Sequence, residues 1–142
     1  MKEFLKKSVL LSLFISCAAV AAPVAVIVNS ANAQNVSQAE VKSIYVDKTI
    51  AWSNGSKIAV YNLPPEDADS EVFARNVLGM SARDAASEES NRGINNTSRN
   101  PQQTKRAALV ASIVAKTPNA IGYIPKDAAD GKPGIRVLFT ID

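Results

Sequence analysis

Residues 104–125, TKRAALVASIVAKTPNAIGYIP, predict a helix that leads directly into a buried strand. Apolar residues repeat at helical spacing in the first half, which indicates that one helix face covers other parts of the protein. We expect four side chains on this face: Leu109, Val110, Ile113 and Val114. Pro118 cannot continue the helix, and the short apolar run 120–124 (AIGYI) has the β-branched and aromatic content of a strand. A helix joined to a strand in this way is half of an α/β layer unit.

The remaining elements follow from similar patterns. Apolar runs bounded by turn residues predict strands over 23–29, 57–61 and 135–139, and the first run is apolar enough to be covered on both faces. Helical spacing and capping residues predict helices over 37–46, 66–78 and 81–92. These residues include a capping box at Ser37 and Glu40 and a helix stop at Gly79. We expect the third of these helices to lie on the surface, because its apolar residues are all alanines. Residues 22–142 are therefore predicted to form one α/β domain with a three-layer α-β-α architecture.

The first 21 residues have the three parts of a secretory signal peptide. Lysines precede an almost wholly apolar run over 9–20, and Ala19-Val20-Ala21 is a cleavage site of small residues. The alternative is a membrane anchor, because the apolar stretch extends to Val28 if Pro23 is tolerated. We favour a signal peptide over residues 1–21, which leaves no stable membrane anchor after cleavage and places the protein in the periplasm or outside the cell.

Two other processing events remain open. Ala31-Asn32-Ala33 is a second small-residue site, but its use would discard the strand predicted over 23–29. Cys17 could be a lipoprotein cysteine, but the residues before it, Phe14-Ile15-Ser16, fit that signal poorly.

Composition argues against several classes of function. The chain has 16 basic and 13 acidic residues, but three of the basic and one of the acidic residues fall in the predicted signal peptide, which leaves a net charge of +1. This balance gives little support to nucleic-acid binding. The chain has no histidine, and its one cysteine is Cys17. The sequence also has no phosphate-binding P-loop and no Gly-x-Ser-x-Gly elbow. We therefore predict a protein that is not an enzyme and has no cofactor or metal site.

Three segments in a fixed order resemble one protein family. Tyr45, Asp47 and Lys48, followed by Trp52 and Gly55, are similar to its "F-x-G-K" and "W-x-x-G" steps. The segments VFARNVLGMS (72–81) and PNAIGY (118–123) are similar to its next helix and to its "P-x-A/S-I-G-Y" strand. The chain thus resembles the substrate-binding proteins of phosphate ABC transporters. The resemblance implies one lobe of a type II periplasmic-binding-protein-like fold.

The chain departs from this family where the family binds phosphate. The family uses an arginine followed by glycine-serine-glycine-threonine at a helix start, where backbone amides and hydroxyls donate to the anion. Here the equivalent segment is YNLPPEDADS, residues 61–70. Pro64 and Pro65 remove two amide donors, three acidic residues add negative charge, and Ser70 is the one hydroxyl donor that remains.

The sequence offers four candidate ligand-binding residues: Asn29, Ser30, Asp69 and Ser70. The first two follow the carboxyl end of the first predicted strand, where open α/β sheets bind ligands, but they suit a turn equally well and we favour the turn. Asp69 lies with Ser70 at a predicted helix start. Asp67 and Asp69 could bind a cation there, but helix capping is the simpler explanation of both. Trp52 could stack on a ligand, but a single tryptophan beside a turn is more often a packing anchor.

A basic patch is a further candidate. Five cations lie within or around the polar loop 95–103: Arg83, Arg92, Arg99, Lys105 and Arg106. They could attract an anion, but acidic residues are interspersed among them, so we favour an ordinary solvated surface.

Two functions are compatible with these observations. The first is a periplasmic solute-binding module for phosphate or another small anion, which serves transport or sensing with a membrane transporter as partner. The second is an interaction or assembly component of the cell envelope that has kept the lobe and lost the phosphate loop.

Overall fold

The structure, a computed structural model, describes residues 22–142, so the predicted signal peptide lies outside the described residues. The elements in chain order are β1 (Val24–Asn29), α1 (Gln38–Tyr45), β2 (Ala59–Asn62), α2 (Ala68–Phe73), a π-helical turn η1 (Ala74–Leu78), α3 (Ala82–Ile94), β3 (Gln103–Thr104), α4 (Ala107–Lys116), β4 (Ala120–Pro125), α5 (Lys126–Ala129) and β5 (Ile135–Ile141). Every predicted helix and strand is present. Two short elements were not predicted: β3 lies in the expected polar loop, and α5 lies in the expected turn before the last strand.

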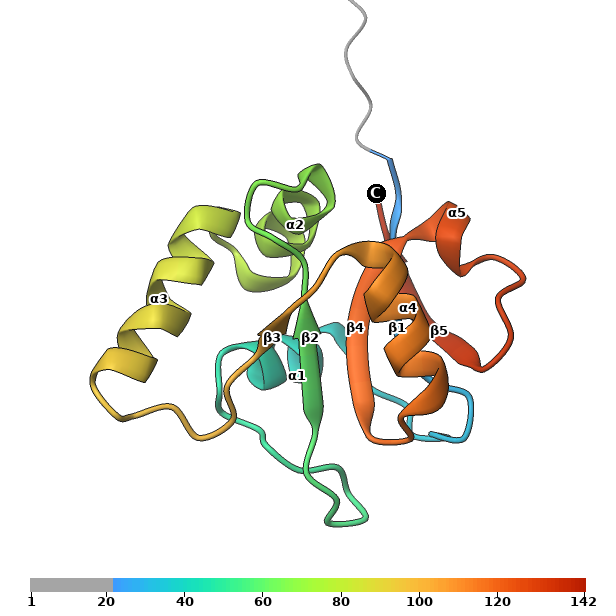
Figure 1. The fold of residues 1–142 in the computed structure, drawn as a ribbon, viewed down its shortest axis with the longest axis horizontal. Coiled ribbons are helices and arrows are strands. Elements are labelled where there is room, and N and C mark those ends of the chain that lie inside the picture. Colours follow the sequence, from blue (N-terminus) through green and yellow to red (C-terminus); the bar gives the residue numbers. More distant parts are fainter. Residues whose placement is uncertain (1–21) are drawn as a thin grey trace, which may run out of the picture.

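The five strands form one mixed sheet in the order β3-β2-β4-β1-β5 (Figure 1). β2 runs parallel to β3 and β4, whereas β1 runs antiparallel to both of its neighbours, β4 and β5. Val24 therefore lies opposite Pro125 at one end of the β1–β4 pair, and Val28 lies opposite Ile121 near the other. The first strand of the chain, β1, thus runs in the opposite direction to the other four strands of the sheet.

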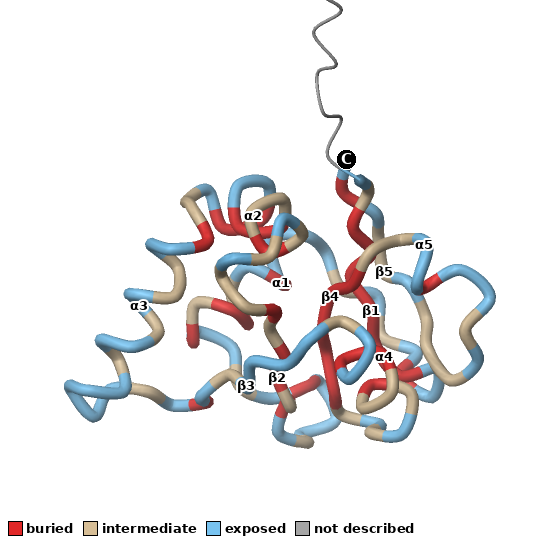
Figure 2. Tube along the Cα trace, turned by 45° about the horizontal axis from the view of Figure 1, so that its top comes forward, coloured by how far each residue is buried: buried red, intermediate tan, exposed pale blue. Residues whose placement is uncertain are grey.

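β1 lies in the centre of the hydrophobic core. All of its six residues are buried, as the continuous apolar composition of the run predicts for a strand that is covered on both faces (Figure 2).

Helix α4 covers one face of the sheet. A Cβ atom added to Gly122 would lie 2.6 Å from Val110 Cγ1 and 3.6 Å from Val114 Cγ2, so the helix lies directly against this glycine of β4. Val110 and Val114 are buried, as predicted, but Leu109 is 43% exposed and Ile113 is only half-buried. Successive helix positions differ by about 100°, and the close contact with the sheet is centred on the two valines, which turns Leu109 toward solvent.

The opposite face of the sheet is covered by α1 and α2. Tyr123 of β4 stacks on Phe73 of α2 with ring centroids 4.0 Å apart, and Tyr45 of α1 meets Phe73 edge-on at 4.7 Å. The predicted capping box begins α1, because Ser37 accepts from the Glu40 amide and Glu40 accepts from the Ser37 amide. Helices on both faces confirm the three-layer α-β-α architecture.

Helix α3 lies at the side of the molecule, and Ala82 is its one buried residue (Figures 1 and 2). The preceding helix ends at Gly79, which adopts the left-handed conformation (φ 74°) predicted for a helix stop. The surface position predicted for α3 is therefore confirmed.

Asp47 has a structural role that the sequence does not reveal. It adopts a positive φ of 66°, at the position where the resembled family has glycine, and its side chain is buried. The carboxylate accepts from the backbone amides of Arg99 at 2.6 Å and Asn100 at 2.8 Å. It thereby fixes the polar loop before β3 to the end of α1.

Candidate functional site

Two helix starts meet at the carboxyl ends of the parallel strands β2 and β4. Helix α2 follows β2, and α4 runs antiparallel to the β4 strand that it precedes, so both helices begin at this edge of the sheet. The segment just before α4 contacts the end of β2, because the Lys105 amide donates to the carbonyl of Asn62 (2.9 Å). We call this region the carboxyl edge.

A buried hydrogen-bond network forms the floor of the carboxyl edge. The Tyr123 hydroxyl donates to Asn62 Oδ1 and lies 3.1 Å from the hydroxyl of Ser70. Asn62 Oδ1 also accepts from the Leu63 amide at 2.9 Å. Both Ser70 and Tyr123 are buried, so the hydroxyl of Ser70 faces the interior and is already engaged.

Burial keeps the tyrosine hydroxyls of this region neutral. It raises the pKa of Tyr123 to about 12, although the hydrogen bonds with Ser70 and the Leu63 amide act in the opposite direction. Burial also raises the pKa of Tyr45 well above its ordinary value. At neutral pH these groups are hydrogen-bond donors and acceptors, and they cannot serve as bases.

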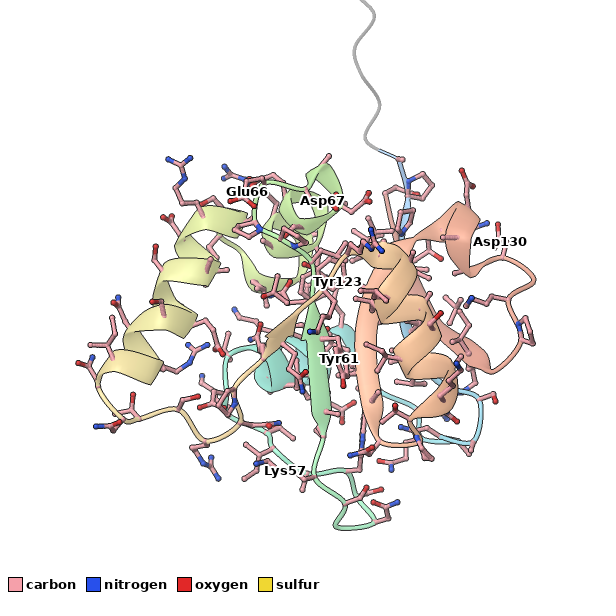
Figure 3. All side chains as sticks on the ribbon, viewed as in Figure 1. Lys57, Tyr61, Glu66, Asp67, Tyr123 and Asp130 are labelled. Carbon is pink, nitrogen blue, oxygen red and sulfur yellow. The ribbon has the colours of Figure 1, made fainter. Side chains whose placement is uncertain are left out.

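The start of α2 carries negative charge and few free amides. Asp67 is the N-cap: its side chain accepts from the Asp69 amide and its carbonyl from the Ser70 amide, both at 3.1 Å. The pKa of Asp69 is raised by burial and then by the neighbouring Asp67. Figure 3 shows Asp67 and Glu66 together above Tyr123, at the same edge. The capping role predicted for Asp67 is confirmed, whereas Asp69 lies within the first turn and does not cap the helix.

The start of α4 has the opposite character. Its N-cap, Arg106, makes no side-chain capping bond, and no acidic residue lies in the first turn. Leu109 and Val110 donate to the carbonyl of Arg106, but the amides of Ala107 and Ala108 have no partner within residues 22–142. Together with the exposed side chains of Lys105 and Arg106, these amides make the α4 start the positive part of the carboxyl edge.

The structure brings Asp69 and Ser70 together but separates them from Asn29 and Ser30. Because β1 runs antiparallel to β4, Asn29 lies at the opposite end of the sheet from the carboxyl edge. There its side-chain amide donates to the Val114 carbonyl and its oxygen accepts from the Ala31 amide, both at 2.9 Å. Asn29 thus forms a turn, and the four candidate residues cannot share one ligand.

Sequence reasoning missed part of the carboxyl edge. Tyr123 and Asn62 have only the appearance of strand residues, and Lys105 and Arg106 were considered only as members of a dispersed basic surface. The signal that could have placed these two cations is their position directly before a helix without an acidic first turn.

Other candidate sites are weaker. Trp52 is 6% exposed and its indole nitrogen donates to the Asn119 carbonyl at 2.9 Å, as expected of a packing anchor. Within residues 22–142, no cluster of acidic side chains is suited to hold a metal ion. The same part of the chain contains no helix with the length and apolar character needed to cross a membrane.

Comparison with known proteins identifies the fold. No family model matches the chain, and no curated protein sequence matches it either. A possible phosphate-binding protein from Planctomyces limnophilus aligns with a TM-score of 0.59 at 15% identity, over 83% of this chain and 42% of that one. An ABC-type phosphate transport receptor from Vibrio cholerae aligns with a TM-score of 0.54 at 14% identity, over 82% of this chain and 46% of that one. The chain spans less than half the length of these two structures. Its fold is that of one lobe of such proteins, as the resemblance implied.

Proposed function

We propose that the protein is a solute-binding module that binds a small anion, such as phosphate, at the carboxyl edge. The observation that carries this proposal is the convergence of the α4 start with Ser70 around Asn62. Two unpartnered amides and two exposed cations, Lys105 and Arg106, supply positive potential there. The fold likeness to phosphate-binding proteins supports the same function.

The two helix starts would contribute unequally. The α2 start in this chain has Pro64 and Pro65, which have no amide proton, and its acidic residues repel an anion. We therefore expect the α4 start to hold the charge, while Ser70 donates a hydrogen bond if its hydroxyl turns from Tyr123 to the anion. Asp69 also lies at this edge and repels an anion once it is ionised, so anion binding should weaken as the pH rises through its raised pKa.

Calorimetric titration of inorganic phosphate at low salt tests this proposal. The double variant Lys105→Ala/Arg106→Ala is expected to weaken binding by at least about tenfold, because charge-assisted hydrogen bonds are lost. Ser70→Ala should weaken binding less. Lys57→Ala is the matched control, since Lys57 lies at the opposite end of the sheet and should bind phosphate like the unaltered protein (Figure 3). Equal affinity in the double variant and the control would remove the α4 start from the site.

A second candidate function is an interaction component of the cell envelope. The observation that favours it is the acidic α2 start, where Glu66, Asp67 and Asp69 occupy the place of a phosphate loop. A protein surface with basic residues would complement this charge. No heat with phosphate, together with a salt-sensitive complex that Asp67→Asn/Asp69→Asn abolishes, would support this function over the first.

The proposed location is the periplasm or the exterior of the cell, and the proposed partner in transport is a membrane transporter. Export would follow from the basic and apolar segment over residues 1–21. Fractionation of cells that express the whole chain tests this. A product that begins near Ala22 and is released with the periplasmic fraction is expected, whereas a full-length product in the membrane fraction would contradict it.

A further inference from the structure

A hollow lies beside the carboxyl edge, between α3 and the segment that follows β2. It has a volume of about 170 Å³. Its walls are largely apolar and come from Leu63, Phe73, Leu78 and Ala85. Exposed Ser90 and Thr104 lie at its margin, so it opens to solvent beside α3. We call it the α3 cavity.

One end of the α3 cavity is polar. Half-buried Asn62 and buried Ser70 and Tyr123, the three members of the hydrogen-bond network, all border it. Asn62 Nδ2 donates one of its two protons to Gln102 Oε1 at 2.8 Å, which leaves the second for a bound molecule. The hydroxyl of Ser70 can also accept a hydrogen bond. The cavity thus offers neutral donors and acceptors at one end and apolar walls elsewhere.

The charges around the α3 cavity exclude an anion. None of the described residues that line it is a lysine or an arginine. The one charged lining residue, Glu89, accepts from Arg92 Nη2 at 2.7 Å and from the Gln102 amide at 2.9 Å. Because this carboxylate is already paired, it neither attracts a cation strongly nor tolerates a second negative charge beside it.

The volume limits the size of an occupant. An engineered apolar cavity of roughly 150 Å³ in another protein binds benzene, so a hollow of this size accommodates one ring or a short branched chain. Most such small ligands keep the apolar part against the walls and direct one polar group to the few hydrogen-bonding groups of the site.

We propose that the α3 cavity is a binding site for a small uncharged molecule that has an apolar ring or branched chain and one amide or hydroxyl group. The polar group pairs with Asn62 and Ser70, and the apolar part contacts Phe73, Leu78 and Ala85. This site shares Asn62 and Ser70 with the anion site but differs from it in its apolar walls and in the charge that it accepts. It therefore does not depend on the α4 start.

Titration with benzamide, followed by amide chemical shifts of the purified protein, tests this proposal. Benzamide is expected to cause saturable shifts at Leu63, Ser70 and Ala85, whereas benzoate, of the same shape but negatively charged, should bind at least tenfold more weakly. Equal binding of benzamide and benzoate, or shifts that do not saturate, would overturn the proposal.

Variants that fill the cavity give the second arm of the test. Ala85→Leu places a larger side chain in the hollow and is expected to weaken benzamide binding at least tenfold, while Ser87→Leu, on the exposed side of the same helix, should leave it unchanged. Ser90→Leu, at the margin, serves in the same way if Ala85→Leu does not fold. Unchanged benzamide binding in a folded filled variant would contradict the site.

Binding of phosphate and benzamide to two variants distinguishes the α3 cavity from the proposed anion site. Lys105→Ala/Arg106→Ala should lose phosphate and keep benzamide, whereas Ala85→Leu should lose benzamide and keep phosphate. Loss of both ligands in either variant would show a single shared site and would overturn the separate cavity.

Discussion

At the residue scale, Tyr123 connects the core to the carboxyl edge. Its ring stacks on Phe73 in the core, and its hydroxyl holds Asn62 and Ser70. A buried phenol with hydrogen-bonding partners stabilises the fold only in its neutral form, because burial disfavours the charged form. The orientation of Ser70 and the stability of the protein at high pH thus depend on the same hydroxyl.

Alkaline unfolding should reveal this dependence. Because the pKa of Tyr123 is raised to about 12 in the folded protein and is near 10 in an unfolded chain, the contribution of neutral Tyr123 is complete below pH 10 and is lost as the pH rises toward 12. A shift of two units corresponds to about 3 kcal/mol. Urea unfolding should show Tyr123→Phe to be less stable by about 1–2 kcal/mol at neutral pH, with this difference shrinking between pH 10 and 12. A constant difference across that range would contradict the assignment.

Asp47 makes a second prediction at this scale. Asp47→Ala removes the acceptor of two backbone amides and places an alanine at a positive φ, so we expect a loss of about 2–4 kcal/mol in the free energy of unfolding. Asp47→Asn keeps one acceptor oxygen and tolerates the backbone conformation, and it should lose much less. Urea unfolding of both variants measures the difference. Equal losses would show that the acceptor oxygen and the backbone tolerance that asparagine retains do not preserve stability.

At the element scale, the packing of α4 on β4 determines which residues of the helix are buried in the core. Helical spacing predicted a buried face with four residues, but the contact is centred on Val110 and Val114, and Leu109 is left partly exposed. Periodicity defines a helix face to within one or two positions, and only the partner surface selects among them. Here that surface is the bare backbone of Gly122, which lets Val110 approach the sheet.

Gly122→Ala tests this close approach. The added Cβ would lie 2.6 Å from Val110 Cγ1, and the β-branched side chain of Val110 cannot easily rotate away. We therefore expect a loss of about 1–3 kcal/mol in the free energy of unfolding, measured with urea. Gly93→Ala is the matched control, because no atom lies within 4 Å of its added Cβ and alanine favours a helix, so it should be neutral or stabilising.

A double-mutant cycle isolates the contact. Val110→Ala makes room for the new methyl group, so Gly122→Ala should cost less in that background than in the unaltered protein. Additive losses would instead assign the cost to the strand itself.

At the scale of the whole molecule, local patterns predicted the elements but not their neighbours. The capping box at Ser37, the stop at Gly79 and the apolar run of β1 depend on nearby residues, and all three are confirmed. The reversed insertion of β1 between β4 and β5 depends on long-range pairing, which no local pattern contains. For this reason the sequence could not tell that Asn29 and Ser70 lie at opposite ends of the sheet.

The same limit applies to the candidate site. β3 has only two residues, both exposed, and nothing in their sequence predicts a parallel pairing with β2. Yet this pairing leads the chain past Asn62 and places Lys105 and Arg106 beside the network of Ser70. The cations of the site were therefore visible in the sequence, but their relation to Ser70 was not.

Amide chemical shifts during a titration with inorganic phosphate test whether the carboxyl edge is the binding edge of this lobe. We expect saturable shifts that are largest at Leu63 and Ser70 and over residues 105–108, with little change at Asn29. Saturable shifts centred on Asn29 and Ser30, or no saturable shift in a well-folded sample, would contradict it.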